Sequence, residues 1–412
     1  MPYVFVAYGV VISFPGFDWL GSVARLTGIP ALFVWLLTAL VNGSIRRPAL
    51  LHWLFGAFVL WTGLTFFWTT SPDDTQHRFY RLTLAFGTSL LIWDVVRTRK
   101  EVDTLFQTVV LSCYAIAVSI AYNAHVGNAS LEDRFSAFGL YPNDIPKMVG
   151  MAMPMAWYLA LESTNKNVFL KVVNYMYPIV GVFTIILTGS RGGLVACIPA
   201  FLFVILTFHK TAPHVKAAAA IATFGALLIA ARLDFSKQLD RFATIGSSLS
   251  NSGDKLNGRF DIWSVAWDLA SKHPWAGIGA GAFPHEMVRY GGPRLAAGLG
   301  LVAHNTYLSV LTETGIIGLL LFLAIIFNGL RDVLKHRGLL RFALGASLIT
   351  WAAGVFVSAW EETAQTWLMF TILAVSAGAL VITKQEQEQA EAEAVEEDAL
   401  SQADPVAAFS AG

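Results

Sequence analysis

The sequence predicts an all-α, polytopic integral membrane protein with about twelve transmembrane helices and one large extramembranous loop. Hydrophobic residues make up 55% of the 412 residues and charged residues only 14%, against roughly 45–50% and 25% in soluble domains. Apolar runs of membrane-spanning size recur along the chain. Only the segment 232–304 and the tail from Lys384 onward lack such a run over a long stretch.

The apolar runs give the expected helices in chain order. They lie near 3–20, 30–43, 50–70, 79–96, 102–123, 145–163, 171–188, 192–208, 216–231, 306–330, 340–359 and 364–383. Pro15 and Gly16 interrupt the first run, so a re-entrant or tilted hairpin is an alternative there. We expect one transmembrane domain over 1–383. The acidic, low-complexity tail 384–412 has no hydrophobic face, which predicts a solvated segment without chemistry.

Basic residues are concentrated in alternate connections between these helices. They are Arg46, Arg47, Arg97, Arg99, Lys100, Lys166, Lys171, Lys210, Lys216, Arg331, Lys335, Arg337 and Arg341. By the positive-inside rule, that side of the membrane is the cytoplasm, both termini are cytoplasmic and the loop 232–304 lies on the opposite side. The formal net charge is zero, so no basic excess indicates a nucleic-acid partner.

The sequence predicts no metal or other cofactor. Cys113 and Cys197 both lie in apolar runs, without paired or metal-ligand spacing, so we interpret them as small packing residues. No Asp-x-Asp or His-Cys cluster marks a metal site on the side of the large loop. A glycine-rich stretch, 277–281, has no preceding strand, so we interpret it as turn glycines and not as a nucleotide loop.

Arg191 lies in Gly-Ser-Arg-Gly-Gly at 189–193, between two apolar runs on the predicted extracytoplasmic side. A charge at mid-bilayer costs about 2.5–3.5 kcal/mol on insertion scales, and less near the interface. A guanidinium has five donors and suits a phosphate or pyrophosphate, and flanking glycines would let such a ligand approach the backbone. The alternative is an arginine that snorkels from a tight turn.

Arg259 lies inside the large loop, directly after a glycine. The residues that follow it recur at helical spacing as Ile262, Trp263, Ala266 and Leu269, which predicts a short amphipathic helix on the membrane or the bundle. We consider Arg259 a second anion-binding candidate, with a solvated loop arginine as the alternative.

His304 closes the large loop, immediately before the apolar run at 306–330. An imidazole with a pKa of about 6.5 can accept a proton at neutral pH, which makes His304 a candidate base. A structural histidine is the alternative. Glu313 follows nine residues later, which on an ideal helix is half a turn round, so we assign it to packing or a buried polar contact.

Four further polar residues are candidates for substrate contact. They are Arg134, Asn143, Asn305 and Tyr307. Asn143 or its neighbour Asp144 is equally well explained as a helix N-cap, and so is Asn305.

Taken together, the motifs resemble the bacterial O-antigen ligase and polymerase superfamily. The set is Gly-Ser-Arg-Gly-Gly at 189–193, Gly-Arg-Phe-Asp-Ile-Trp at 258–263, His-Pro-Trp-Ala-Gly-Ile-Gly-Ala-Gly-Ala-Phe at 273–283 and His-Asn-Thr-Tyr-Leu at 304–308, followed by Glu-Thr-Gly at 313–315. The Pro-Asn in segment 138–143 looks like the upstream element of that superfamily. The resemblance covers residues 130–330 by motif and the whole chain by topology.

The resemblance implies an inverting, metal-independent, GT-C-like glycosyltransferase of the bacterial inner membrane. Such an enzyme moves a glycan from undecaprenyl pyrophosphate to an acceptor hydroxyl in the periplasm. Arg191 and Arg259 would stabilise the departing pyrophosphate, and His304 would accept the proton of the acceptor. The implied partners are the undecaprenyl-pyrophosphate-linked glycan donor, the surrounding membrane lipids, and an acceptor.

The acceptor distinguishes the members of the superfamily. A ligase uses lipid A-core oligosaccharide, a polymerase uses a second lipid-linked glycan, and a third branch glycosylates proteins. A compact chain with one large loop favours the first two, and we expect the ligase slightly over the polymerase. A permease or flippase remains as a different class, which charges buried in the middle of several helices would favour.

Overall fold

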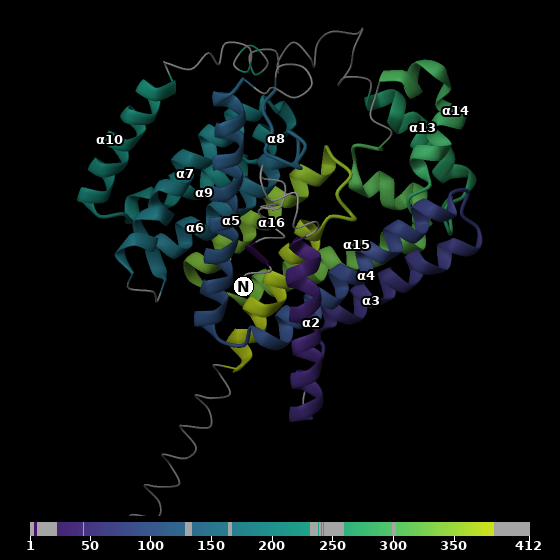
Figure 1. Cartoon of the computed structure of the whole chain (residues 1–412), viewed down its shortest axis with the longest axis horizontal. Coiled ribbons are helices and arrows are strands. Elements are labelled where there is room, and N and C mark those ends of the chain that lie inside the picture. The colour runs from purple at the N-terminus through teal and green to yellow at the C-terminus, as the bar shows by residue number, and fades with distance from the viewer. Residues whose placement is uncertain are drawn as a thin grey trace, which may run out of the picture.

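The computed structural model describes residues 4–5, 23–43, 45–127, 134–163, 167–230, 238, 240, 242, 259–298 and 302–382, and these are largely helical (Figure 1). The labelled elements are α2 (Val23–Asn42), α3 (Leu50–Leu64), η3 (Thr65–Phe67), α4 (Pro72–Val95), α5 (Arg99–His125), α6 (Ile145–Glu162), α7 (Val168–Thr188), α8 (Arg191–Ala196), α9 (Ile198–Thr207), η5 (Phe208–Lys210), α10 (Pro213–Ala230), α13 (Arg259–Lys272), α14 (Phe283–Gly298), α15 (Thr306–Lys335) and α16 (Gly338–Phe356). The C-terminal helix, Ala364–Ile382, follows α16.

The predicted membrane character is confirmed, but twelve membrane spans are not. Each expected range after the first coincides with helix, and the first lies outside the described residues except for Val4 and Phe5. Within the described residues, 6 helices are long and apolar enough to cross a membrane: Leu50–Phe67, Arg99–His125, Val168–Thr188, Thr306–Lys335, Gly338–Phe356 and Ala364–Ile382. The expected helix at 192–208 is interrupted at Cys197, between α8 and α9. The tail 384–412 lies outside the described residues.

Local side-chain contacts set the helix ends that matter for the site. α7 ends at Gly189, whose φ of 56° favours glycine because it lies in the left-handed region. Ser190 then caps α8 by accepting a hydrogen bond from the Gly193 amide. The chain therefore reverses within two residues and places Arg191 in the first turn of α8.

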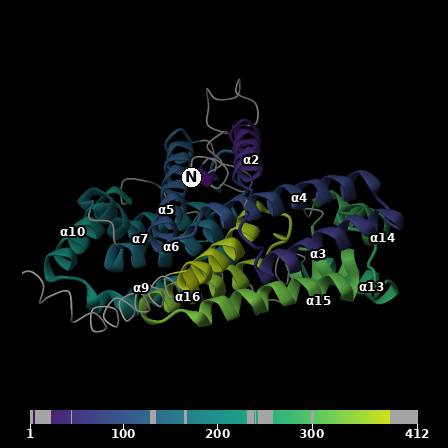
Figure 2. The same cartoon turned by 90° about the horizontal axis from the view of Figure 1, so that it is seen from below.

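The helices form two neighbouring groups joined by an aromatic core. In one group α6 packs against α5, α7, α9 and α16; in the other α15 packs against α3 and α13. Trp367 of the C-terminal helix stacks on Phe55 of α3 with ring centroids 3.7 Å apart, and Phe370 meets Trp351 of α16 edge-on at 4.8 Å. Figure 2 shows α15 running along one edge of the molecule, with α13 and α14 at one end of it. Cys113 and Cys197 are buried, as expected of packing residues.

The described part of the large loop contains two helices, α13 and α14. The amphipathic helix expected after Arg259 is confirmed, because Ile262, Ala266 and Leu269 are buried on one face of α13. They form a small apolar cluster with Phe283 and other residues of the loop. This end of the loop is therefore packed against α15.

The glycine-rich stretch fits into a break in α15. Gly277, Gly279 and Gly281 have φ of 68°, 108° and 77°, which confirms them as turn glycines. Gly315 interrupts α15 with a φ of 68° and ψ of −171°, and a Cβ there would coincide with the backbone of Trp275. Backbone hydrogen bonds cross the break, from Ile278 N to Thr312 O (3.0 Å), Gly279 N to Glu313 O (3.0 Å) and Ile316 N to Pro274 O (2.8 Å).

Candidate functional site

The three residues expected to be catalytic all lie where helices begin. Arg191 is the first residue of α8, Arg259 is the first residue of α13, and His304 lies two residues before α15. Asp144 occupies the N-cap position of α6. The N-terminal ends of α6, α13 and α15 carry partial positive charge, so helix ends and guanidinium groups favour the same kind of ligand, an anion.

A first set of hydrogen bonds connects α6 to the turn that carries Arg191. The Asn143 side-chain oxygen accepts from Arg134 Nη2 (2.6 Å) and from Ser190 Oγ (3.0 Å). Arg134 Nε also donates to the Thr188 carbonyl at the end of α7 (3.0 Å). Asn143 therefore holds the start of α6 beside the start of α8.

A second set connects His304 to α13 and to the segment after α16. Trp263, one turn after Arg259, donates to the Ala303 carbonyl (2.9 Å). Thr306 Oγ1 donates to the Ser358 carbonyl (2.8 Å) and accepts from the Trp360 amide (2.8 Å). The backbone on both sides of His304 is thus fixed to neighbouring elements.

The glycines that follow Arg191 lie in tight contact with neighbouring helices. A Cβ at Gly193 would lie 2.6 Å from the Pro146 ring of α6, and one at Gly192 would lie 3.3 Å from Val357 after α16. These contacts give the two glycines a packing role, and the approach of a ligand to their backbone stays a prediction. They let α8 sit directly against α6 and the end of α16.

The cations of the site interact electrostatically with one another. Burial, together with the guanidinium of Arg191, lowers the pKa of Arg259. Burial, together with Arg259 and Lys147, lowers the pKa of the His304 imidazole from 6.5 to about 4, and Asp144 opposes this shift. His304 is therefore neutral at pH 7 and able to accept a proton.

His304 also has an unusual backbone conformation. Among the described residues it is the only non-glycine residue with a positive φ, 47°. Such conformations cost roughly 1–3 kcal/mol and are concentrated at functional sites. Histidine is one of the non-glycine residues that adopt a positive φ more often than others. The fixed backbone on either side keeps the imidazole in this position.

Lys147 is a site residue that the sequence analysis missed. It lies in the first turn of α6, its side chain is fully buried, and its Nζ is 2.8 Å from Asp144 Oδ1. The same ammonium lies 4.2 Å from the centroid of the Trp360 ring. The signal was a single cation at the start of an apolar run, the same signal that marked Arg191.

The four residues expected to contact substrate have structural partners in this structure. Arg134 and Asn143 bond to each other, as described above. Asn305 caps α15 by accepting from the Leu308 amide (3.1 Å). The Tyr307 ring packs against Phe322 and others. At α6, Asp144 takes the N-cap position, as the N-cap alternative expected, but its side chain makes no cap hydrogen bond. Substrate contact by these four residues stays a prediction.

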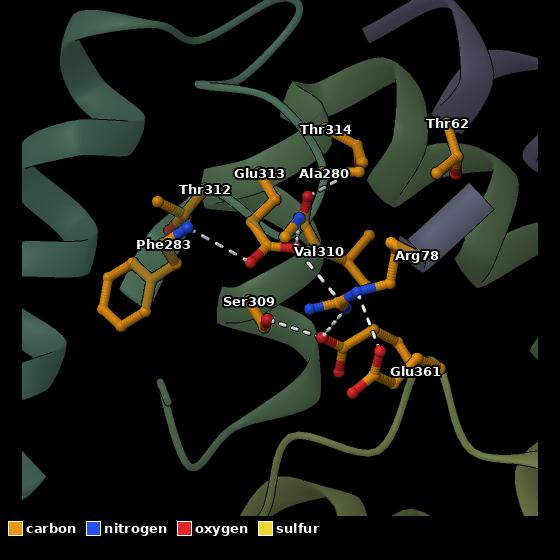
Figure 3. A network of polar contacts seen from close by, with 12 residues as sticks. Thr62, Arg78, Ala280, Phe283, Ser309, Val310, Thr312, Glu313, Thr314 and Glu361 are labelled. Atoms are coloured by element: carbon orange, nitrogen blue, oxygen red, sulfur yellow. Dashed lines mark hydrogen bonds and ion pairs between the residues drawn. The ribbon is translucent and has the colours of Figure 1, made fainter. Parts of the chain in front are cut away.

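A separate network of ion pairs surrounds Glu313 (Figure 3). Glu313 is buried and its Oε2 lies 3.4 Å from Arg78 Nη1, while Oε2 and Oε1 accept from the Gly281 and Phe283 amides (2.9 and 3.4 Å). Arg78 Nη1 also pairs with Glu361 Oε1 (2.6 Å), which accepts from Ser309 Oγ (2.7 Å). The expected buried polar contact of Glu313 is thus confirmed.

The two polar regions differ in what they can bind. Around His304, the described residues that act on one another through their charges include the cations Arg191, Arg259 and Lys147, and Asp144 is the carboxylate partner of Lys147. Such a cluster can hold an anion with more than one negative charge, beside a neutral imidazole that can take a proton.

Comparisons with known proteins bear on this region. Residues 177–323 match the family model described as O-Antigen ligase. The matched residues run from α7 into α15 and include Arg191, Arg259 and His304, whereas Lys147 lies outside them. A search of curated protein sequences found no match.

Proposed function

We propose, from the chain's membership of the O-antigen ligase and polymerase superfamily through residues 177–323, that it transfers a glycan from a lipid pyrophosphate to an acceptor hydroxyl. The membership itself supports O-antigen ligase- or polymerase-type activity in a membrane protein. The proposal adds the donor, undecaprenyl pyrophosphate, and the place, the periplasmic face of the bacterial inner membrane.

The observation that carries the proposal is the meeting of Arg191, Arg259 and His304. These residues come from three separate elements, yet Arg191 acts electrostatically on Arg259, and Arg259 on His304. A pyrophosphate leaving group needs cations, and an attacking hydroxyl needs a base. Both needs are supplied within one cluster.

The proposed step follows from this arrangement. The acceptor oxygen attacks the anomeric carbon of the donor sugar, and the bond from that carbon to the phosphate oxygen breaks with its electron pair going to the pyrophosphate. Arg191 and Arg259 stabilise the charge that grows on the leaving group. The neutral His304 imidazole takes the hydroxyl proton. Attack from the side opposite the leaving group inverts the configuration.

The acceptor we propose is lipid A-core oligosaccharide, which makes the protein a ligase. The alternative is a polymerase of O-antigen or exopolysaccharide, which uses a second lipid-linked glycan at the same site. Deleting the gene distinguishes them: loss of a ligase leaves full-length lipid-linked polymer, whereas loss of a polymerase leaves single repeat units.

A permease or flippase is the second alternative, and the ion-pair network bears on it. Arg78 of α4 and Glu313 of α15 are charged residues whose side chains are largely buried between helices, the feature that would favour transport. They pair with each other and with Glu361, so their charges serve contacts within the protein. Transport remains the weaker interpretation.

The direct test is glycan transfer by purified protein. Donor and acceptor are supplied in detergent with EDTA, and product is followed by mass. We expect transfer, with inversion at the anomeric carbon, in the presence of EDTA. A second assay uses the protein reconstituted into proteoliposomes. Movement of intact donor across their membrane, without any glycan transfer in detergent, would instead establish the permease.

The proposed orientation has its own test. A cysteine at Ser252, in the part of the large loop outside the described residues, should react with a membrane-impermeant thiol reagent from the periplasm. A cysteine at the exposed Arg337, between α15 and α16, should be protected. The opposite pattern would reverse the topology.

A further inference from the structure

The Lys147 side chain lies between α6 and α16, at a point where α16 carries a glycine. Its side chain is fully buried, and a Cβ at Gly354 of α16 would lie 2.6 Å from Lys147 Cγ and 2.8 Å from Cδ. Only a residue without a side chain leaves room for the lysine stem at this point. The stem therefore runs over Gly354 and delivers the ammonium to Asp144 and the Trp360 ring.

A second lysine pair in the same protein shows that this burial is unusual. Lys335 and Asp332 have the same three-residue spacing in α15, with Nζ and Oδ1 2.6 Å apart. The Lys335 side chain is 42% exposed, whereas that of Lys147 is 0% exposed. Hydration supports the charge of Lys335, whereas that of Lys147 depends on its neighbours.

Among the described residues that act on His304, positive charge is in excess. Asp144 is paired with Lys147, and both Lys147 and Arg259 act on His304 as positive charges. Buried charge without compensation is costly, so a cluster of this composition is stabilised by an added anion. An ammonium has three N–H donors, and Asp144 takes one of them.

We propose that Lys147 is a third donor-binding residue, which holds the pyrophosphate together with Arg191 and Arg259. Asp144 is its counter-ion in the structure, and the ammonium lies over the face of the Trp360 ring. The ligand class is a diphosphate ester. The inference rests on the proposed function and extends its site to α6.

The test measures binding of inorganic pyrophosphate to the purified protein in detergent, by calorimetry without divalent cations. Lys147→Met keeps the stem and removes the charge, and we expect binding about tenfold weaker, the size of one lost charge-assisted hydrogen bond. Lys335→Met, which breaks the matched pair outside the site, should bind as the parent protein does. Parent-like binding by folded Lys147→Met protein would overturn the inference.

Asp144→Asn separates a binding role from a merely structural ion pair. If Asp144 competes with the ligand for Lys147, then Asp144→Asn should tighten pyrophosphate binding, opposite in sign to Lys147→Met. If the pair only supports the fold, both variants should weaken binding alike, which would overturn the inference. Should Lys147→Met fail to fold, the double variant Asp144→Asn with Lys147→Met removes both charges and is compared with Asp144→Asn alone. The double variant should bind pyrophosphate about tenfold more weakly than Asp144→Asn, and equal binding by the two would also overturn the inference.

The same assay distinguishes failure of this inference from failure of the proposed function. Arg191→Lys and Arg259→Lys should both weaken pyrophosphate binding. If they do so and Lys147→Met does not, only the role of Lys147 is wrong. If none of the three variants weakens binding, the site does not bind pyrophosphate and both proposals fall.

Discussion

The cationic cluster around His304 and the ion-pair network around Glu313 lie close to the same helix, α15, but they balance charge in opposite ways. In the network, Arg78 meets Glu313, Glu361 and Glu362, and Glu313 also accepts two backbone N–H bonds. In the cluster, the described cations that act on His304 are Arg259 and Lys147, and the described carboxylate that opposes them is Asp144. The network therefore serves contacts within the protein, whereas the composition of the cluster fits the proposed binding of an external anion.

The strongest test of the cluster is His304. His304→Asn should fold, because asparagine also tolerates positive φ, yet lose about 10²–10⁴ in transfer rate, the range that a positioned base contributes. His304→Ala should lose as much. Donor binding should persist in both. Near-parent turnover by either variant, as a monodisperse protein, would make His304 structural and remove the mechanism.

Substitutions in the ion-pair network should change the stability of the protein and leave pyrophosphate binding unchanged. Removing one partner of a buried ion pair costs about 3–5 kcal/mol, so Arg78→Met should lower the midpoint of thermal unfolding strongly. Arg81→Met removes a neighbouring arginine that is 61% exposed and pairs with Glu362, and should change stability by at most about 1 kcal/mol. Pyrophosphate binding by folded Arg78→Met protein should match the parent. A loss of that binding with unchanged stability would contradict the division between the two regions.

Replacing arginine by lysine should have a smaller effect on glycan transfer and tests the geometry of the guanidinium group. Arg191→Lys and Arg259→Lys keep the charge but lose the planar fork, so each should reduce transfer about tenfold. Arg81→Lys, in the other region, is the matched control and should leave transfer unchanged. If Arg191→Lys behaves like Arg81→Lys, Arg191 is a snorkelling residue after all.

The smallest expected effect is a displacement in pH dependence. Burial, together with Arg259 and Lys147, lowers the pKa of His304 to about 4 against the opposing effect of Asp144. Bound pyrophosphate offsets those cations, so the pKa of His304 should rise in the complex. Activity is lost as pH falls through the pKa of the base, so the acid limb of kcat should lie at higher pH than that of kcat/KM. Coincident limbs in the two pH profiles would show that the donor does not neutralise the cations facing His304.

The sequence was sufficient to locate the helices after the first apolar run, because hydropathy is a local signal. Motif order selected Arg191, Arg259 and His304, which interact electrostatically in the structure, and their catalytic roles stay a prediction. Lys147 was not predicted as a site residue, because it lies inside an apolar run and its position depends on Gly354, which is far away in the chain. The pairing of Arg78 with Glu313 escaped prediction for the same reason. A glycine such as Gly315 is tolerated in helices, so its break in α15 had no distinct sequence signal.

Twelve membrane spans are not confirmed, and 6 helices among the described residues are long and apolar enough to cross a membrane. Apolar length in the sequence takes no account of the interruptions that packing introduces. α8 and α9 form one apolar run in the sequence, but the chain departs from a single helix at Cys197. α4 is helical over its expected length, yet it carries Arg78 and Arg81 along with acidic residues in its first turn. Such charges depend on partners from other helices, and those partners are not visible in a local window.

The break at Gly315 has a consequence for the biogenesis of the protein. Backbone groups left without partners in a bilayer cost several kcal/mol each, and α15 has such groups at its break until the segment 274–279 supplies hydrogen bonds. That segment precedes α15 in the chain, so it emerges from the ribosome before α15 does. The nascent loop can therefore act as an internal chaperone that receives the broken helix as it enters the membrane. A translocation machinery that delayed the loop would leave α15 to insert with its hydrogen bonding incomplete.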